Sequence, residues 1–178
     1  GTKLFRIRAL VEFGDVEAGE LGGYVEKESN LGHDDNAWVY GDARVYDNAL
    51  VYDNARVYGD AQVSGDARVY DNARVYGDAW VYGDAWVYGN ALVCGNARVY
   101  DNARVYGDAW VYGNARVCGD ALVCGDARVC GNGDYAYAHG FGSVNRTTTF
   151  FRLKDGGVGV RCGCFYGTLA QFRDKIRE

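Results

Sequence analysis

The residues with the clearest capacity for chemistry are two histidines and six cysteines, and none of them completes a catalytic or metal-binding motif. His33 is followed by two aspartates, which suits the orientation of an imidazole ring, but a histidine in a turn is the simpler interpretation. His139 lies near the other end of the chain. Cys162 and Cys164 would place two thiols on one face of a strand, yet a lone Cys-x-Cys pair is a weak zinc signal. The sequence therefore predicts no catalytic residue, no metal site and no cofactor.

The element that must position every other side chain is an uninterrupted six-residue repeat, Ala-x-Val-Tyr-Gly-Asp. Alanine recurs at every sixth position from Ala37 to Ala127 and valine from Val39 to Val129, which makes sixteen units. On an extended chain this alanine and valine point to one side, and the variable residue between them points to the other. The Gly, Asn and Asp residues that follow favour tight turns. A short strand and a sharp bend every six residues indicate a chain that coils around an axis, each coil stacked on the last.

This pattern resembles the hexapeptide repeat of left-handed parallel β-helix proteins, in which an aliphatic residue and a small residue recur with Gly and Asn or Asp between them. The resemblance implies three hexapeptides per triangular coil and a left-handed path. We therefore expect an all-β fold: a left-handed parallel β-helix of about five to six coils, with an N-terminal strand cap and a small C-terminal β-hairpin plus helix. The segment NARVYGDAWVYG is also similar to hexapeptide-repeat proteins of bacterial and phage genomes, whose role is largely unassigned.

The repeat divides the chain into three parts. Residues 1–36 are expected to form an N-terminal strand and entry cap, because residues 2–13 alternate with period two and place Phe5, Ile7, Ala9 and Val11 on one face. Two extra residues near His33 break the phase before the repeat begins. Residues 37–132 are expected to form the β-helix, and residues 133–178 a C-terminal cap.

The C-terminal cap has its own local signals. If the hexapeptide register continued, Tyr135, His139 and Phe141 would point inward, and the large aromatic rings would plug the open end of the solenoid. Residues 147–165 indicate a β-hairpin that turns at residues 154–157. A short helix should follow from Thr168, which forms a capping box with Gln171, and its apolar face should hold Leu169, Phe172 and Ile176.

The outward positions carry the binding candidates. Stacking every eighteenth residue gives columns rich in Arg, Trp and Tyr, residue types that are enriched at binding hot spots. The plainer interpretation is that flat β-faces favour aromatic residues, while Arg stacks on Tyr and pairs with turn aspartates. The candidates for a binding face are Trp80, Trp86, Trp110, Arg74, Arg98, Arg104 and Arg116. The candidates for self-association through the cap are Phe150, Phe151, Phe165, Leu169 and Phe172.

Three functions from different classes are compatible with this pattern. A non-enzymatic solenoid scaffold fits best; if the chain is phage-encoded, as the resemblance allows, its partner would be a host protein. The resemblance also raises a hexapeptide acyltransferase that uses acyl-CoA, but the uninterrupted register leaves no room for the extruded loop that such enzymes use. A nucleic-acid mimic that inhibits a DNA-handling enzyme would use the rows of turn aspartates, although the interspersed arginines work against it.

Composition limits the partners and the compartment. The net charge of −5 argues mildly against direct nucleic-acid binding, and no apolar run approaches the ~20 residues that would span a bilayer. Four of the six cysteines replace the tyrosine of the repeat, so they are not expected to form a disulfide framework, and a cytoplasmic location is the simplest expectation. Exposed aromatic faces and a small C-terminal element predict a homo-oligomer, a dimer or trimer, without a membrane partner.

Overall fold

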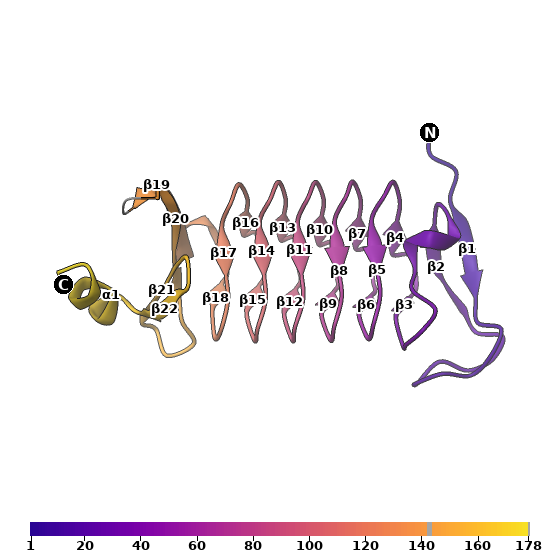
Figure 1. Cartoon of the computed structure of the whole chain (residues 1–178). Coiled ribbons are helices and arrows are strands. Elements are labelled where there is room, and N and C mark those ends of the chain that lie inside the picture. Colours follow the sequence, from indigo (N-terminus) through magenta and orange to yellow (C-terminus); the bar gives the residue numbers. More distant parts are fainter. Residues whose placement is uncertain (142–143, 178) are drawn as a thin grey trace.

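A parallel β-solenoid forms the body of the protein and carries a cap at each end (Figure 1). The structure, a computed structural model, describes residues 1–141 and 144–177. In each repeat the outward residue and the valine form a two-residue strand, and each strand pairs in parallel with the strand eighteen residues later, as Trp86 does with Arg104. This register confirms the predicted stacking of three hexapeptides per coil. The left-handed path stays a prediction.

The stacked strands form three faces. The β3 face consists of β3 (Trp38–Val39), β6 (Arg56–Val57), β9 (Arg74–Val75), β12 (Leu92–Val93), β15 (Trp110–Val111) and β18 (Arg128–Val129). The β4 face consists of β4 (Arg44–Val45), β7 (Gln62–Val63), β10 (Trp80–Val81), β13 (Arg98–Val99) and β16 (Arg116–Val117). The β5 face consists of β5 (Leu50–Val51), β8 (Arg68–Val69), β11 (Trp86–Val87), β14 (Arg104–Val105) and β17 (Leu122–Val123).

The core is a column of alanine and valine side chains inside these faces. From Ala43 to Val129, every repeat alanine and valine has an exposed fraction of 0%. Alanine leaves room beside the turn while valine fills the centre, so a single pair of residue types packs coil after coil. Burial of this apolar column is the main source of stability, because each two-residue strand contributes few hydrogen bonds of its own.

The turns between strands require left-handed backbone angles. Gly77 has φ +71°, and a Cβ atom there would lie 3.1 Å from the backbone nitrogen of Gly95 in the next coil. Asp71 takes the same region at φ 56° and offsets the strain, since its carboxylate accepts a hydrogen bond of 3.0 Å from the Gly89 N–H. The repeat therefore has Gly at this position, which lacks a Cβ atom, or Asp, whose hydrogen bond offsets the strain.

The N-terminal cap contains β1 (Phe5–Arg8), which pairs antiparallel with β2 (Leu21–Val25), and a short 3-10 helix, η1 (Glu28–Asn30). Val25 pairs with Val45, an offset of twenty residues, so the two extra residues predicted before the repeat are confirmed. The strand predicted over residues 2–13 is too long, because the chain bends at Leu10 and turns back between Phe13 and Val16. Val11 in the bend and Phe5 in β1 are both exposed.

The C-terminal cap is a four-stranded antiparallel sheet followed by one helix. Its elements are η2 (Asn132–Asp134), β19 (Tyr135–Phe141), β20 (Arg146–Arg152), β21 (Val158–Cys162), β22 (Phe165–Thr168) and α1 (Leu169–Lys175). The hairpin of β20 and β21 is confirmed, and its turn is closed by the Leu153 N–H, which donates to the Gly157 carbonyl. The capping box of Thr168 and Gln171 is also confirmed. The sequence did not indicate β19 and β22 as partners of that hairpin.

The cap satisfies backbone donors that the last coil leaves without a next coil. The Arg116 N–H donates to the Asn132 side chain at 2.9 Å, and the Leu122 N–H donates to the Thr149 hydroxyl at 2.9 Å. Asp134 accepts from the N–H groups of Cys130 and Gly131, both at 3.0 Å. A parallel sheet edge left open would invite pairing with another chain, so these bonds end the solenoid.

Asp134 also connects the last coil to β20. Arg152 Nε donates to its other carboxylate oxygen at 2.9 Å. Burial raises the pKa of Asp134, but the hydrogen bonds from Cys130, Arg152 and Gly131 outweigh burial, and the pKa lies below its usual range. A lowered pKa in the folded state means that the contribution of this carboxylate to stability is present at neutral pH and is lost as the pH falls through that lowered value.

The aromatic plug differs from the prediction. Phe151 in β20, with an exposed fraction of 1%, belongs to the solenoid core, and Tyr135 and Tyr137 pack beside it half-buried. His139 is exposed, so its predicted inward position is wrong; the chain leaves the hexapeptide register at η2. The side chain of Phe141 lies outside the described part of the structure.

Candidate interaction surface

The predicted tryptophans lie on three different faces of the solenoid. Trp80 is on the β4 face, Trp86 on the β5 face and Trp110 on the β3 face. Trp80 and Trp110 have exposed fractions of 39% and 44%, while Trp86 is half-buried. The structure therefore does not gather these rings into one patch. Each ring instead forms a local cluster with arginine from a neighbouring coil, on both sides for Trp86 and on one side for Trp80 and Trp110.

The cluster around Trp86 is the most complete. The guanidinium carbons of Arg68 and Arg104 lie 5.1 Å and 4.5 Å from the centre of the indole ring, one on each side along the solenoid axis. Tyr70 contacts the same ring edge-on at 6.2 Å. These distances are in the range of cation–π attraction, worth about 0.5–1 kcal/mol for exposed pairs. The register of β8, β11 and β14 creates this Arg–Trp–Arg ladder, since it places the three residues in direct succession.

The ladder borders an open hollow on the β5 face. The hollow has a volume of about 440 Å³ and is lined by the three ladder residues together with Asp66, Asp84 and Asn102 at the adjacent corner. A flat aromatic ring with guanidinium groups on both sides suits a partner that offers a carboxylate beside an apolar group.

The other two tryptophans have one arginine each. Arg98 lies 5.0 Å from the Trp80 ring and Arg128 lies 4.3 Å from the Trp110 ring. Arg128 is held further by hydrogen bonds to the carbonyls of Asp108 and Ala127. The predicted Arg74 and Arg116 are exposed, and no aromatic partner is recorded for their guanidinium groups.

Few repeat arginines are neutralised by an acid. Within the described residues, the arginine–carboxylate ion pairs are Arg56 with Asp15 and Arg152 with Asp134. The expectation that repeat arginines pair with turn aspartates is therefore wrong. The turn side chains bond mainly to the next coil: Asn90 donates to Asp108, and Asn102 donates to Asp120. Among the described residues, the repeat arginines other than Arg56 therefore have no carboxylate within ion-pair distance.

Tyrosines form stacked columns at the corners. In the longest column, Tyr52, Tyr70, Tyr88 and Tyr106 follow each other with ring centres 4.9 Å apart and planes within 6° of parallel. Burial, followed by the effect of Tyr88, raises the pKa of Tyr70 to about 12. The columns therefore remain neutral at physiological pH and act as rigid edges beside the arginine rows.

The predicted self-association residues are mostly used within the cap itself. Phe151 and Phe172 are buried, and Phe150 and Phe165 are half-buried, both with ring contacts to Phe172. Of the five candidates only Leu169 is exposed. Ile176, expected beside it on the helix, is exposed as well, and Phe172 is the buried residue of α1.

The histidines and cysteines are dispersed. His33 lies 3.8 Å from Glu28 at the N-terminal end, and His139 contacts the Thr147 hydroxyl at 2.9 Å at the C-terminal end. The six cysteines are free, and only Cys124 is buried. Among the described residues, no three His, Cys, Asp or Glu side chains converge in a way that would hold a metal ion.

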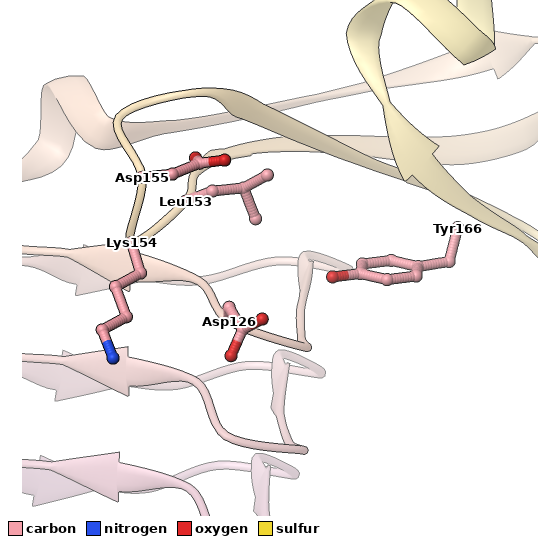
Figure 2. Close-up of a pocket in the computed structure, with 5 residues that line it drawn as sticks. All are labelled: Asp126, Leu153, Lys154, Asp155 and Tyr166. Atoms are coloured by element: carbon pink, nitrogen blue, oxygen red, sulfur yellow. The ribbon is translucent and has the colours of Figure 1, made fainter.

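A second hollow lies where the C-terminal sheet meets the last coil. Figure 2 shows Asp126 between Lys154 and Tyr166, below the turn that carries Leu153 and Asp155. The Lys154 N–H donates to the Asp126 carbonyl, and the Tyr166 hydroxyl packs against Gly125. The hollow has a volume of about 410 Å³. Its charges are mixed, so it favours no single class of ligand.

A third hollow was missed by the sequence. The loop between β1 and β2 brings Asp15 onto the β3 face, where its carboxylate accepts a hydrogen bond of 2.5 Å from Arg56 and one of 3.2 Å from the Tyr40 hydroxyl. The bond from Arg56 lowers the pKa of Asp15. Beside this contact lies a hollow of about 370 Å³ lined by Asp15, Tyr40, Arg56, Tyr58 and Arg74. Asp15 stands outside the repeat, so no periodic signal marked it.

Comparison with known families supports the repeat architecture. Segments within residues 37–83 and 97–133 match the family described as YdcK Beta solenoid repeat; the matched segments are 37–52, 43–59, 49–65, 61–73, 67–83, 97–113, 109–125 and 115–133. They cover a little under half of the chain. Comparison with curated proteins gives no match. No helix in the described residues has the length and apolar character needed to cross a membrane. The chain is thus a β-solenoid repeat protein.

Proposed function

We propose that this β-solenoid is a non-enzymatic interaction scaffold whose arginine–tryptophan clusters bind an acidic surface of a protein partner. The observation that carries the proposal is the Trp86 cluster, in which two arginines without an acid partner stack on one ring beside an open hollow. Arginine and tryptophan dominate binding hot spots, and unpaired guanidinium groups supply charge complementarity.

The solenoid register also favours a scaffold over an acyltransferase. Coil follows coil from Ala37 to Val129 at a constant offset of eighteen residues, and both histidines are exposed at the ends of the chain. The free arginines oppose a nucleic-acid mimic, which would need an acidic surface. We place the protein in the cytoplasm because its six cysteines are free. Because the repeat resembles those of phage genomes, we propose that the partner is a host protein.

The test is capture of a partner from bacterial lysate by wild-type protein and by matched variants, read by native mass spectrometry. We expect Trp86→Ala and Arg104→Ala to weaken retention by at least roughly tenfold, as for hot-spot residues. Gln62→Ala changes an outward position on another face and should retain the partner. Equal retention by all variants contradicts the proposal. Retention of only a CoA-sized molecule assigns the enzyme function instead, with His33 as the residue to mutate.

We also propose that the protein self-associates through its ends. Large exposed apolar side chains gather at the caps, with Leu10 and Val11 at the N-terminal end and Leu169 and Ile176 at the C-terminal end. Sedimentation equilibrium at tens of micromolar should show a dimer or trimer, and Ile176→Asp should shift it toward monomer. A wild-type monomer at that concentration would contradict this part of the proposal.

A further inference from the structure

The contact between Asp15 and Arg56 shows how a carboxylate binds to this surface. Asp15 comes from a loop outside the solenoid, and it meets a guanidinium group of one coil and a tyrosine hydroxyl of the coil before. The side chains of Asp15 and Arg56 keep exposed fractions of 59% and 30%. The site is therefore accessible from outside, and the loop acts as an internal ligand of the repeat.

The repeat places the same pair of residues one coil further on, with a different orientation of the tyrosine ring. Tyr58 and Arg74 lie eighteen residues after Tyr40 and Arg56, and the strands β6 and β9 pair in register. The backbone is equivalent as well, since the Tyr40 N–H donates to Val57 and the Tyr58 N–H donates to Val75. Tyr40, which donates to Asp15, stands edge-on to Tyr58 at 88°, whereas Tyr58 and Tyr76 are parallel within 1°.

The charges around this second pair are unbalanced. The hollow next to Asp15 contains two arginines and one carboxylate, and Asp15 is bonded to Arg56. Arg74 is exposed, and among the described residues no carboxylate lies within ion-pair distance of it. The guanidinium fork of Arg74, which fits a carboxylate in two-point contact, thus lines the same hollow as Tyr58.

We propose that Tyr58 and Arg74 form a carboxylate-binding site for an Asp- or Glu-bearing segment of a protein partner, with the Asp15 contact as its template. This inference rests on the proposed scaffold function and names the partner chemistry for the β3 face. A protein carboxylate fits better than a nucleic-acid backbone, because the turn aspartates Asp60 and Asp78 lie close to Tyr58 and Arg74 in the sequence and the whole chain carries a charge of −5. A dense polyanion would meet those charges, whereas a single carboxylate need not.

The experiment uses the loop itself as the probe. An acetylated and amidated peptide of residues 14–19 (GDVEAG) is titrated into the full-length protein, and the side-chain Nε–H signal of Arg74 and the ring signals of Tyr58 are followed by NMR. We expect saturable shifts in the millimolar range, as befits an exposed ion pair. The peptide with Asn in place of Asp and Gln in place of Glu carries no carboxylate and should lose these shifts.

Variants of the chain separate the site from general charge attraction. Arg74→Gln should weaken binding roughly fivefold when read at Tyr58. Asp15→Asn should release Arg56 and add a second set of shifts, at Tyr40. Arg44→Gln is the matched control, because Val25 pairs with Val45 and the residue after Val25, at the position that Tyr58 has relative to Arg74, is Glu26, so binding should not change. Unchanged binding in Arg74→Gln overturns the inference.

Three further outcomes have defined meanings. Tighter binding of a short oligothymidylate than of the peptide at Arg74 would overturn the assignment to protein carboxylates. If the peptide binds at Arg74 but no partner is captured through Trp86 and Arg104, the carboxylate site stands and the scaffold function fails. If a partner is captured but the peptide does not shift Arg74, the scaffold function stands and this inference fails.

Discussion

Replacing Val87 with aspartate is expected to abolish cooperative folding of the solenoid. Val87 has an exposed fraction of 0% and lies mid-solenoid, between Val69 and Val105 of the neighbouring coils. A carboxylate at this position would lie in the buried column of alanine and valine side chains. Because an unpaired buried charge is costly, the loss should exceed about 4 kcal/mol. Circular dichroism during thermal unfolding measures the effect.

The matched control is Arg104→Ala, which changes an outward residue one coil away. Arg104 contributes its stacking on Trp86, so its removal should cost no more than about 1 kcal/mol. A second control, Val87→Thr, keeps the side-chain volume and introduces a hydroxyl in place of a charge. The loss of stability in Val87→Thr should fall between the losses in Arg104→Ala and Val87→Asp. If the Val87→Asp and Arg104→Ala variants melt at the same temperature, the assignment of inward and outward positions is wrong.

The inward and outward positions were predictable because a single constraint repeats. The spacing of Ala37, Val39 and their successors determines on which side of the strand each side chain lies. The offset of eighteen residues came from the resemblance to hexapeptide-repeat β-helix proteins, and with it the neighbours of Trp86 followed from counting. The same spacing of alanine and valine recurs in every coil. Local capping signals were equally readable, since the Thr168 hydroxyl at the N-cap accepts a hydrogen bond from the Gln171 N–H in the first turn of the helix.

The contacts outside the repeat were not predictable for the opposite reason. Asp15 meets Arg56 across forty-one residues, and nothing in either local sequence specifies the path of the loop between β1 and β2. The failure at His139 has the same origin, since the hexapeptide register ends at η2 and the chain turns into an antiparallel sheet. The tendency of arginine to pair with nearby aspartates also misled, because the turn side chains bond to the next coil instead.

Replacing Phe151 with alanine is expected to open the C-terminal end of the solenoid. Phe151 has an exposed fraction of 1% and lies on β20, next to the last coil, where it joins the alanine–valine core. Phe→Ala changes at fully buried sites cost about 3–5 kcal/mol, because apolar contact is lost and a cavity remains. We therefore expect a fall in unfolding free energy of that size, and faster amide exchange at the N–H groups of Leu122 and Arg116, which the cap protects.

The neighbouring residue provides the control for this prediction. Phe150 points to the opposite side of β20 and contacts Phe172 of α1 at a ring distance of 6.0 Å. Since adjacent residues of a strand face opposite sides, Phe150→Ala should loosen the helix while the Leu122 amide stays protected. Hydrogen exchange measured by NMR distinguishes the two variants. A larger loss of protection at Leu122 in Phe150→Ala than in Phe151→Ala would mean that the helix, and not the buried phenylalanine, closes the solenoid.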